Sequence, residues 1–293
     1  MSIPAATYVC LDGAVVPASR AKVSVFDRGL LYGDGLFETV RCYNGTPLAL
    51  RAHLGRLRAS ARFLGIPVPG RPWARDIDRL LRRNRLLSTD AWVRITLTRG
   101  AAAPGLLPPR QPQPTAFLIA GRVDPNVAVV QQRGARVILL PFARHGFLAE
   151  HKVLDYLPGI LGRVMAARHE AFEALYVDED GLVTEGTTSN IFACRRGRLV
   201  TPPVTGVLPG VTRRFVIELA AAAGLRLVER PLKARDLYRA DEVFVTSSLA
   251  EVVPVMMIDD RQIRDGQVGP RTRRLQSLYR QLVDKILRKG NRS

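Results

Sequence analysis

The stretch 36–65 constrains the fold most strongly, because a strand pattern and a helix pattern follow one another there. Residues 36–43 have strand character, and Asn44-Gly45 is a turn signal typical of a tight hairpin. Residues 50–65 then repeat apolar side chains at helical spacing, and Gly65 favours a helix end. The apolar positions are Leu50, Leu54, Leu57, Ala61 and Leu64. The chain must therefore combine paired strands with an amphipathic helix.

The remaining elements follow in mixed order. We expect a helix over about 72–87, a strand that ends at Gly100 and a loop over 101–114. In the second half we expect strands near 128–131 and 136–140, a helix from about Pro158, a hairpin turned at 178–181, a helix over 211–223, a strand at 242–246 and a terminal helix near 270–288. Because strands and helices do not alternate strictly, the predicted class is α+β rather than a doubly wound sheet.

The length of 293 residues, 47% of them hydrophobic, suffices for two domains with separate cores. The stretch 121–127, GRVDPNV, has the composition of a linker. We therefore predict a small first domain, 1–120, and a larger second domain, 128–293. No apolar run is long enough to span a membrane, and Met1–Cys10 lacks the pattern of a signal peptide, which together predict a cytoplasmic protein.

The net charge of +18 comes almost entirely from arginine. The lysines are only Lys22, Lys152, Lys233, Lys285 and Lys289. A basic chain suits nucleic-acid phosphates, but no zinc-finger or RRM pattern accompanies these arginines. The simpler interpretation is a general bias toward arginine together with attraction of small anionic molecules. A non-enzymatic nucleic-acid-binding protein is therefore a remote alternative. The three cysteines are far apart, and no metal site is predicted.

Lys152 is the lysine whose surroundings differ from those of the others. It stands in AEHKVLDYL, beside apolar residues and just before a predicted helix. An apolar environment lowers the pKa of a lysine amine and makes it available as a nucleophile. An ordinary surface lysine at a helix entry is the alternative interpretation.

Four further segments carry polar groups suited to binding a phosphorylated ring. Glu185 begins a run of turn formers in VTEGTTSN, where a fixed or merely solvated carboxylate is expected. The segment LPGVTR, 208–213, opens a predicted helix whose free N–H groups suit a phosphate. Ser247 and Ser248 supply hydroxyl groups at a strand end. Arg56, in HLGRL, lies at the edge of an apolar helix face, where a snorkelling arginine is the alternative.

Together, these segments resemble the fold-type IV (class IV) pyridoxal-phosphate aminotransferases, which include branched-chain aminotransferases, D-amino-acid aminotransferases and aminodeoxychorismate lyases. The resemblance runs from about Val9 to Leu282, with the motifs in the same order and spacing. It implies pyridoxal 5′-phosphate as the cofactor and a two-domain fold like that of D-amino-acid aminotransferase. The small N-terminal α/β domain carries the substrate pocket and dimer contacts, and the larger mixed domain binds the cofactor.

The resemblance also implies roles for individual residues. Lys152 is then the catalytic lysine that forms the Schiff base with the cofactor and moves the substrate α-proton. Glu185 pairs with the pyridine nitrogen, and Tyr156 lies near the phenolate oxygen. The other implied cofactor contacts are Leu208 at the ring face and Arg56, Val211, Thr212, Ser247 and Ser248 at the phosphate.

For the substrate, the resemblance points in two directions. The implied substrate residues are Tyr32, Phe37, Thr39, Arg94 and Leu249. Phe37 and Arg94 match branched-chain positions, but that group usually has glycine where Thr39 stands, and a threonine there occurs among the lyases. Thr98-Arg99-Gly100 matches the D-amino-acid and lyase groups. The D-amino-acid enzymes, however, carry an Arg and a His directly after this motif to bind the substrate carboxylate. In this chain the residues at that place are 101–105, AAAPG, so that binding site is missing.

The reaction implied is therefore amino transfer between an amino acid, branched-chain-like or D, or an amine, and a 2-oxo acid. The alternative is an aminodeoxychorismate lyase that releases pyruvate and 4-aminobenzoate, because the same lysine and glutamate serve both reactions. In this family the small domain of a second subunit closes the active site, which implies a homodimer.

Overall fold

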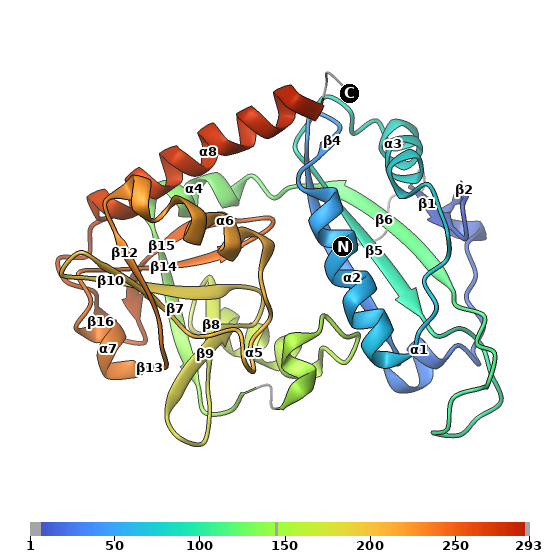
Figure 1. Cartoon of the computed structure of the whole chain (residues 1–293), viewed down its shortest axis with the longest axis horizontal. Helices are drawn as coiled ribbons and strands as arrows, with labels where there is room; N and C mark the ends of the chain where they lie inside the picture. The colour runs from blue at the N-terminus through green and yellow to red at the C-terminus, as the bar shows by residue number, and fades with distance from the viewer. Residues whose placement is uncertain (1–6, 144–145, 291–293) are drawn as a thin grey trace. The chain divides into compact units, whose positions relative to one another are not determined.

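The computed structural model describes residues 7–143 and 146–290 and divides the chain into two compact units (Figure 1). The first unit comprises Met1–Val123 and the short segment Lys152–Asp155, and the second comprises Asp124–His151 and Tyr156–Ser293. The boundary at Val123 falls inside the predicted linker, whereas the return of 152–155 to the first unit was not predicted. Residues 1–6, to which the prediction of no signal peptide mainly refers, lie outside the described residues.

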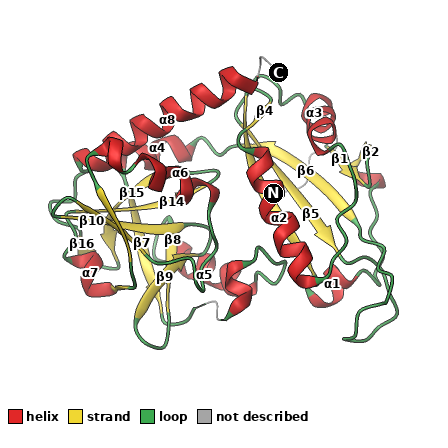
Figure 2. Ribbon diagram, viewed as in Figure 1, coloured by secondary structure: helices red, strands yellow, loops and turns green. Residues whose placement is uncertain are grey.

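The first unit is built on a six-stranded sheet of order β2-β1-β6-β5-β3-β4 (Figure 2). Its strands are β1 (Tyr8–Leu11), β2 (Ala14–Pro17), β3 (Gly35–Tyr43), β4 (Thr46–Pro47), β5 (Ala91–Thr98) and β6 (Ala116–Arg122). Its helices are η1 (Ala18–Arg20), α1 (Arg28–Tyr32), α2 (Leu50–Leu64) and α3 (Trp73–Arg83). The predicted hairpin is confirmed, because β3 and β4 are antiparallel and Asn44 and Gly45 both have positive φ.

The core of the first unit forms where α2 and α3 pack on this sheet. The predicted helix over 50–65 is confirmed: Leu54, Leu57 and Ala61 of α2 are buried with strand residues in one apolar cluster. Ile77, Leu80 and Leu81 of α3 join the same cluster. The helix α2 ends at Gly65 in the left-handed conformation, as its sequence indicates.

The second unit contains a larger mixed sheet of order β12-β11-β10-β14-β15-β7-β8-β9-β13, with β16 paired to β15. Its strands are β7 (Ala135–Leu140), β8 (Glu173–Val177), β9 (Leu182–Gly186), β10 (Asn190–Arg195), β11 (Arg198–Thr201), β12 (Arg226–Glu229), β13 (Leu232–Lys233), β14 (Glu242–Ser247), β15 (Glu251–Ile258) and β16 (Arg261–Gln262). Its helices are α4 (Asn126–Arg133), η2 (Phe147–Glu150), α5 (Leu157–Arg168), α6 (Val211–Leu219), η3 (Ala221–Ala223), α7 (Ala234–Tyr238) and α8 (Pro270–Gly290).

Both faces of this sheet are covered. Along β14, Val243 and Val245 belong to one apolar cluster and Phe244 to another, as the alternation of side chains in a strand requires. The face that includes Phe244 also buries Val216 of α6 and Leu275 of α8. Within the described ranges, no helix is long and apolar enough to cross a membrane.

One sequence prediction is wrong: residues 128–131 belong to helix α4 and not to a strand. The valines of this stretch favour a strand locally. However, Val127 and Val130 both pack on the core of the second unit, and Gln131 donates a hydrogen bond to the main-chain oxygen of Ala250 at 2.8 Å. Positions three and four apart share one face only in a helix, so tertiary packing decides the structure here.

Glycine at position 35 is required by the packing around the start of β3. A Cβ atom there would lie 2.6 Å from Cδ1 of Leu154 and 2.7 Å from the main-chain oxygen of Leu97. We predict that Gly35→Ala destabilises the first unit by about 1–3 kcal/mol, because the added methyl group overpacks the site. Both tryptophans, Trp73 and Trp92, lie in this unit, so denaturant unfolding followed by their fluorescence measures the change.

The matched control is Gly55→Ala in α2. No atom lies within 4 Å of a Cβ atom built at Gly55. This variant is expected to gain up to about 1 kcal/mol, because alanine favours the helix more than glycine does. Equal effects of the two substitutions would contradict the packing argument.

Candidate active site

Main-chain pairing with β3 fixes Lys152 in the first unit. The amide of Phe37 donates to the oxygen of Lys152 at 2.9 Å, and the amide of Leu154 donates to the oxygen of Gly35 at 3.0 Å. Leu36 and Val153 form the bridge between these two hydrogen bonds. The Lys152 amine lies 4.5 Å from the centroid of the Phe37 ring. The backbone of this segment, paired with β3, therefore determines the position from which the lysine side chain extends.

The Phe37 ring also contacts an arginine from the neighbouring strand. Thr39 of β3 pairs with Arg94 of β5, and the Arg94 guanidinium lies 3.6 Å from the centroid of the Phe37 ring. Cation–π contacts of this kind hold an arginine against an aromatic face. Four predicted site residues of this unit, Lys152, Phe37, Thr39 and Arg94, are therefore brought together.

Glu38 points to the opposite face of β3, toward α2, and organises a buried charge cluster. Its carboxylate accepts hydrogen bonds from Nε and Nη2 of Arg56, both at 2.7 Å, and contacts Nδ1 of His53 at 2.8 Å. Burial raises the pKa of Glu38, but the charge and hydrogen bonds of Arg56 and the His53 contact outweigh it and lower the pKa from 4.5 to about 2. The predicted phosphate ligand Arg56 is thus oriented by a carboxylate of its own unit.

The low pKa of Glu38 predicts an acid-sensitive first unit. A carboxyl group with a lowered folded-state pKa contributes stability that is present above its ordinary value and is lost as the pH falls through the folded-state value. We predict that the stability of this unit falls between pH 4.5 and about 2. Tryptophan fluorescence during denaturant unfolding at several pH values measures it.

Glu38→Gln tests the assignment. The variant leaves the mostly buried Arg56 guanidinium without its carboxylate, which costs about 3–5 kcal/mol near neutral pH. It should also show a weaker pH dependence than the wild-type chain in the same window. The residual slope belongs to other carboxyl groups such as Asp34, whose pKa burial raises but hydrogen bonds from Arg99 and Arg28 lower overall. Parallel pH profiles of the two proteins would contradict the role of Glu38.

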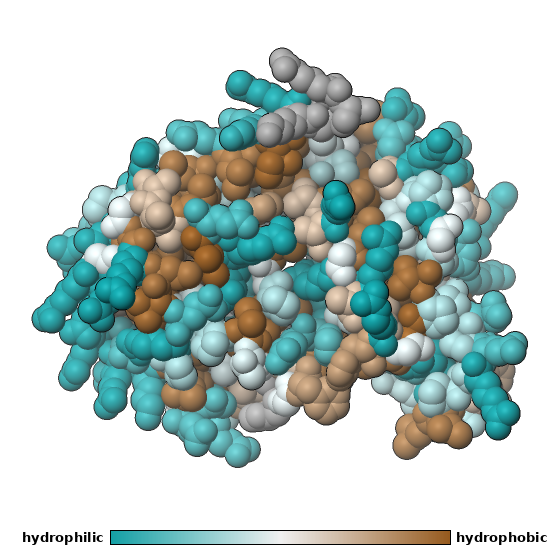
Figure 3. All heavy atoms as spheres, in the orientation of Figure 1, coloured by the Kyte–Doolittle hydropathy of each residue, from teal (hydrophilic) through white to brown (hydrophobic). Residues whose placement is uncertain are grey.

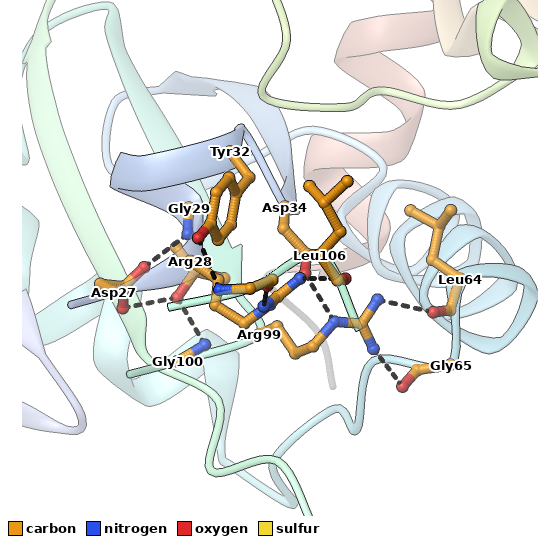
Figure 4. Close-up of polar contacts among 12 residues, drawn as sticks. Asp27, Arg28, Gly29, Tyr32, Asp34, Leu64, Gly65, Arg99, Gly100 and Leu106 are labelled. Atoms are coloured by element: carbon orange, nitrogen blue, oxygen red, sulfur yellow. Dashed lines mark hydrogen bonds and ion pairs between the residues drawn. The ribbon is translucent and has the colours of Figure 1, made fainter. Parts of the chain in front are cut away.

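A second charge cluster organises the segment 27–34, which precedes β3 (Figure 4). Oδ2 of Asp34 accepts hydrogen bonds from Nε of Arg28 and Nε of Arg99, both at 2.7 Å. Arg99 also donates to the oxygens of Leu64 and Gly65 at the end of α2. These partners belong to the fold of the first unit, so Arg99 serves the structure rather than a substrate carboxylate.

The same cluster anchors the loop between β5 and β6. Arg28 donates to the main-chain oxygens of Gly105 at 2.7 Å and Leu106 at 2.9 Å. The amide of Gly105 donates to the Tyr32 hydroxyl at 2.9 Å, and the Arg28 guanidinium lies 4.9 Å from the centroid of the Tyr32 ring (Figure 4). The predicted substrate residue Tyr32 is thus held with this loop and not in the cluster around Phe37.

In the second unit, Glu185 of β9 and the segment before α6 are joined by hydrogen bonds. The amide of Leu208 donates to Oε2 of Glu185 at 3.0 Å, and the Leu208 oxygen accepts from Nδ2 of Asn190 at 2.9 Å. Glu185 is only 4% exposed, so this carboxylate is fixed and buried rather than merely solvated. At Gly210, a Cβ atom would lie 2.1 Å from Oδ1 of Asn190, so a side chain there would displace Asn190.

The predicted phosphate ligands lie at two element ends. Helix α6 begins at Val211 and Thr212, both buried, and among the described residues no side chain caps its first turn. Ser247 is the last residue of β14, and Ser248 and Leu249 lie in the turn that leads to β15. The Ser247 hydroxyl accepts a hydrogen bond from the amide of Ala250 in this turn at 3.1 Å. Free N–H groups at the start of α6 suit an anion.

Tyr156 is hydrogen-bonded to a loop that is held by Glu173, a residue that the sequence did not indicate. Its hydroxyl donates to the main-chain oxygen of Thr187 at 2.9 Å. The loop that contains Thr187 is bound in turn by the carboxylate of Glu173. The sequence did offer one indication: three consecutive hydroxyl residues, 187–189, follow a strand. Hydroxyl groups need hydrogen-bond acceptors when they are buried, so an acidic partner could have been expected.

Comparisons with known proteins identify the family of this chain. The profile of the amino-transferase class IV family matches residues 35–258. A putative branched-chain-amino-acid aminotransferase of Methanocaldococcus jannaschii is 40% identical, over 94% of this chain and 96% of that protein. The crystal structure of the T.th. branched-chain amino acid aminotransferase with pyridoxamine 5′-phosphate superposes with a TM-score of 0.86 at 32% identity, over 95% of this chain and 94% of that chain.

A relative named for a different reaction also aligns over nearly the whole chain. The aminodeoxychorismate lyase of Bacillus subtilis is 31% identical, over 97% of this chain and 98% of that protein. The α+β, two-domain fold expected from the sequence is confirmed by these likenesses. All of these relatives bear the names of enzymes, which supports the enzymatic prediction over the nucleic-acid-binding alternative.

Proposed function

Because the chain belongs to the amino-transferase class IV family, we propose that it is a pyridoxal-phosphate-dependent aminotransferase that moves the amino group of a branched-chain amino acid to a 2-oxo acid. The observation that carries the proposal is the position of Lys152, whose amine lies 4.5 Å from the centroid of the Phe37 ring. An amine beside an aromatic ring can act as a nucleophile, and the ring offers an apolar surface to a substrate side chain.

The residues present fit pyridoxal phosphate. When bound, this cofactor supplies an aldehyde for the amino group and a ring that withdraws electrons from the substrate α-carbon. The buried Glu185 carboxylate is the group that would keep a proton on the ring nitrogen, and Leu208 and Tyr156 would hold the ring. In the second unit, the start of α6 would offer main-chain N–H donors to the phosphate. In the first unit, Arg56, oriented by Glu38, is the side chain that we assign to the same group.

Lys152 has two roles in this proposal. Its amine would hold the cofactor. Once freed by the substrate, the same amine would act as the base that takes the proton from the substrate α-carbon and as the acid that gives it back. The main-chain hydrogen bonds to β3 fix the position from which the amine acts. Fixed positioning of this kind lowers the entropic part of the barrier.

The choice of a branched-chain donor rests on the first unit. A D-amino-acid enzyme needs charged groups to hold the substrate carboxylate, but Arg99 is bound by Asp34 and by two main-chain oxygens. The residues that follow, 101–105, carry no charge. The resemblance to the lyases, which carry a threonine at the position of Thr39, favours aminodeoxychorismate cleavage as the second candidate function.

We further propose that the protein acts as a homodimer. Large apolar side chains are exposed on the segment around α1 and on the loop between β5 and β6: Val25 at 67%, Phe26 at 53%, Leu30 at 66%, Leu106 at 83% and Leu107 at 89%. A brown apolar patch is visible at the lower right of Figure 3. Because Arg28 and Tyr32 of α1 bind the loop, these side chains form a preformed surface that a second copy would cover.

We predict that Leu107→Asp shifts the protein toward the monomer, because a buried unpaired charge at a subunit interface is costly. Sedimentation equilibrium at several protein concentrations measures this shift. Val204→Asp, at a valine of the second unit that is 41% exposed, is the control and should leave the wild-type mass unchanged. A monomeric wild-type protein, or a Leu107→Asp dimer of unchanged strength, would disprove the proposed interface.

We also predict that Lys152 alone carries the covalently attached cofactor. After incubation with pyridoxal phosphate and borohydride reduction, peptide mass spectrometry should place the phosphopyridoxyl group on the peptide that contains Lys152. Lys152→Ala should lose this modification and the visible absorption band. Lys22→Ala, at an exposed lysine of the same unit, should keep both. Modification of another lysine in the wild-type protein would refute the assignment.

A further inference from the structure

Glu173 is a buried carboxylate that the proposed chemistry does not use. It is the first residue of β8, its exposure is 1%, and it pairs in the sheet with Val137 of β7. An ionisable side chain is rarely buried in this way unless hydrogen bonds compensate for the loss of water. Its partners therefore indicate why it is there.

Within the described part of the chain, the hydrogen-bond donors to Glu173 come from a single loop, 187–189, between β9 and β10, except for the amide of Ala174. The Arg163 guanidinium lies 3.8 Å from Oε1. Oε1 accepts from the Thr187 hydroxyl and from the amide of Ala174, the latter at 2.9 Å. Oε2 accepts from the amide of Thr188 at 3.1 Å, the Thr188 hydroxyl at 2.8 Å and the Ser189 hydroxyl at 3.0 Å. Three successive hydroxyl residues thus converge on one carboxylate.

This pattern requires a carboxylate rather than an amide. Each of its two oxygens accepts from a main-chain amide, one from Ala174 and the other from Thr188. A hydroxyl group can rotate and accept instead of donating, but a main-chain N–H cannot. The NH₂ group of a glutamine at position 173 would therefore face a main-chain N–H in either orientation.

The loop that Glu173 holds adjoins the proposed cofactor residues of the same unit. Its first hydroxyl residue, Thr187, offers the main-chain oxygen that accepts the Tyr156 hydroxyl. Only Gly186 separates the loop from Glu185, and a Cβ atom at Gly186 would lie 2.3 Å from the Ser189 hydroxyl oxygen and 3.1 Å from the Glu173 carboxyl carbon. This close packing couples the carboxylate to the backbone beside Glu185.

We propose that Glu173 is a positioning residue for the cofactor site: it sets the conformation of 187–189 and thereby the orientation of Tyr156 and Glu185. The inference rests on the proposed function, because it assigns these two residues to pyridoxal phosphate. The Tyr156 hydroxyl is oriented by the Thr187 oxygen, so a displaced loop changes the electrostatic environment of the bound ring.

The test compares Glu173→Gln with the wild-type chain. The cofactor-free forms are titrated with pyridoxal phosphate to obtain the dissociation constant, and the pH at which the visible band of the bound cofactor changes is recorded. We expect the variant to bind about tenfold more weakly, since loss of a buried hydrogen-bond acceptor is of that order. We also expect its spectroscopic midpoint pH to move.

Two further variants keep the test decisive. Glu179→Gln, at an exposed residue of the turn between β8 and β9, makes the same chemical change and should match the wild type in both measurements. Ser189→Ala removes a single donor to Glu173 and should produce smaller changes of the same kind. If Glu173→Gln does not fold, Ser189→Ala takes its place in the test.

The outcomes separate this inference from the proposed function. If the wild-type chain binds no pyridoxal phosphate, the proposed function is wrong. If the wild type binds it, and Glu173→Gln and Ser189→Ala bind it with wild-type affinity and an unchanged midpoint pH, the inference is overturned. A loss of thermal stability without either change would assign Glu173 a purely structural role and would overturn it too.

Discussion

The pairing of Lys152–Leu154 with the start of β3 is the interaction on which the arrangement of the candidate site in the first unit depends. The chain on either side of 152–155 belongs to the second unit, and two main-chain hydrogen bonds hold this short segment on the first. The pairing needs glycine at position 35, because a side chain there would occupy the space of Leu154. The main-chain pairing therefore determines the position from which the Lys152 side chain extends.

Carboxylates that are buried or partly buried order the surrounding groups in both units. Glu38 orients Arg56, Asp34 joins Arg28 to Arg99, and Glu173 binds the hydroxyl groups of 187–189. In each case one acidic side chain satisfies several donors that would otherwise be buried without partners. The excess of arginine is thus partly structural, since Arg28 and Arg99 bind carboxylates and main-chain oxygens inside the first unit.

Local patterns predicted the parts of the fold that depend on local spacing. The apolar stripe of α2, the Asn44-Gly45 turn and the terminal helix α8 are examples. Short β-branched stretches such as 127–130 are ambiguous, so α4 was mistaken for a strand. Contacts between residues far apart in the sequence produce no periodic pattern from which they could be predicted. Asp34 and Arg99 are 65 positions apart, and Glu173 and Ser189 are 16 positions apart. The motifs indicated Lys152 and Glu185, but not the residues that hold them.

The most direct test of the proposed function is a single-turnover titration of the pyridoxal-phosphate-loaded protein with L-leucine, followed by the visible absorption band. We predict that L-leucine converts the cofactor to its aminated form and yields one equivalent of the 2-oxo acid, whereas D-alanine leaves the band unchanged. Release of pyruvate from aminodeoxychorismate by a protein whose band L-leucine does not alter would contradict it and would establish the lyase reaction instead.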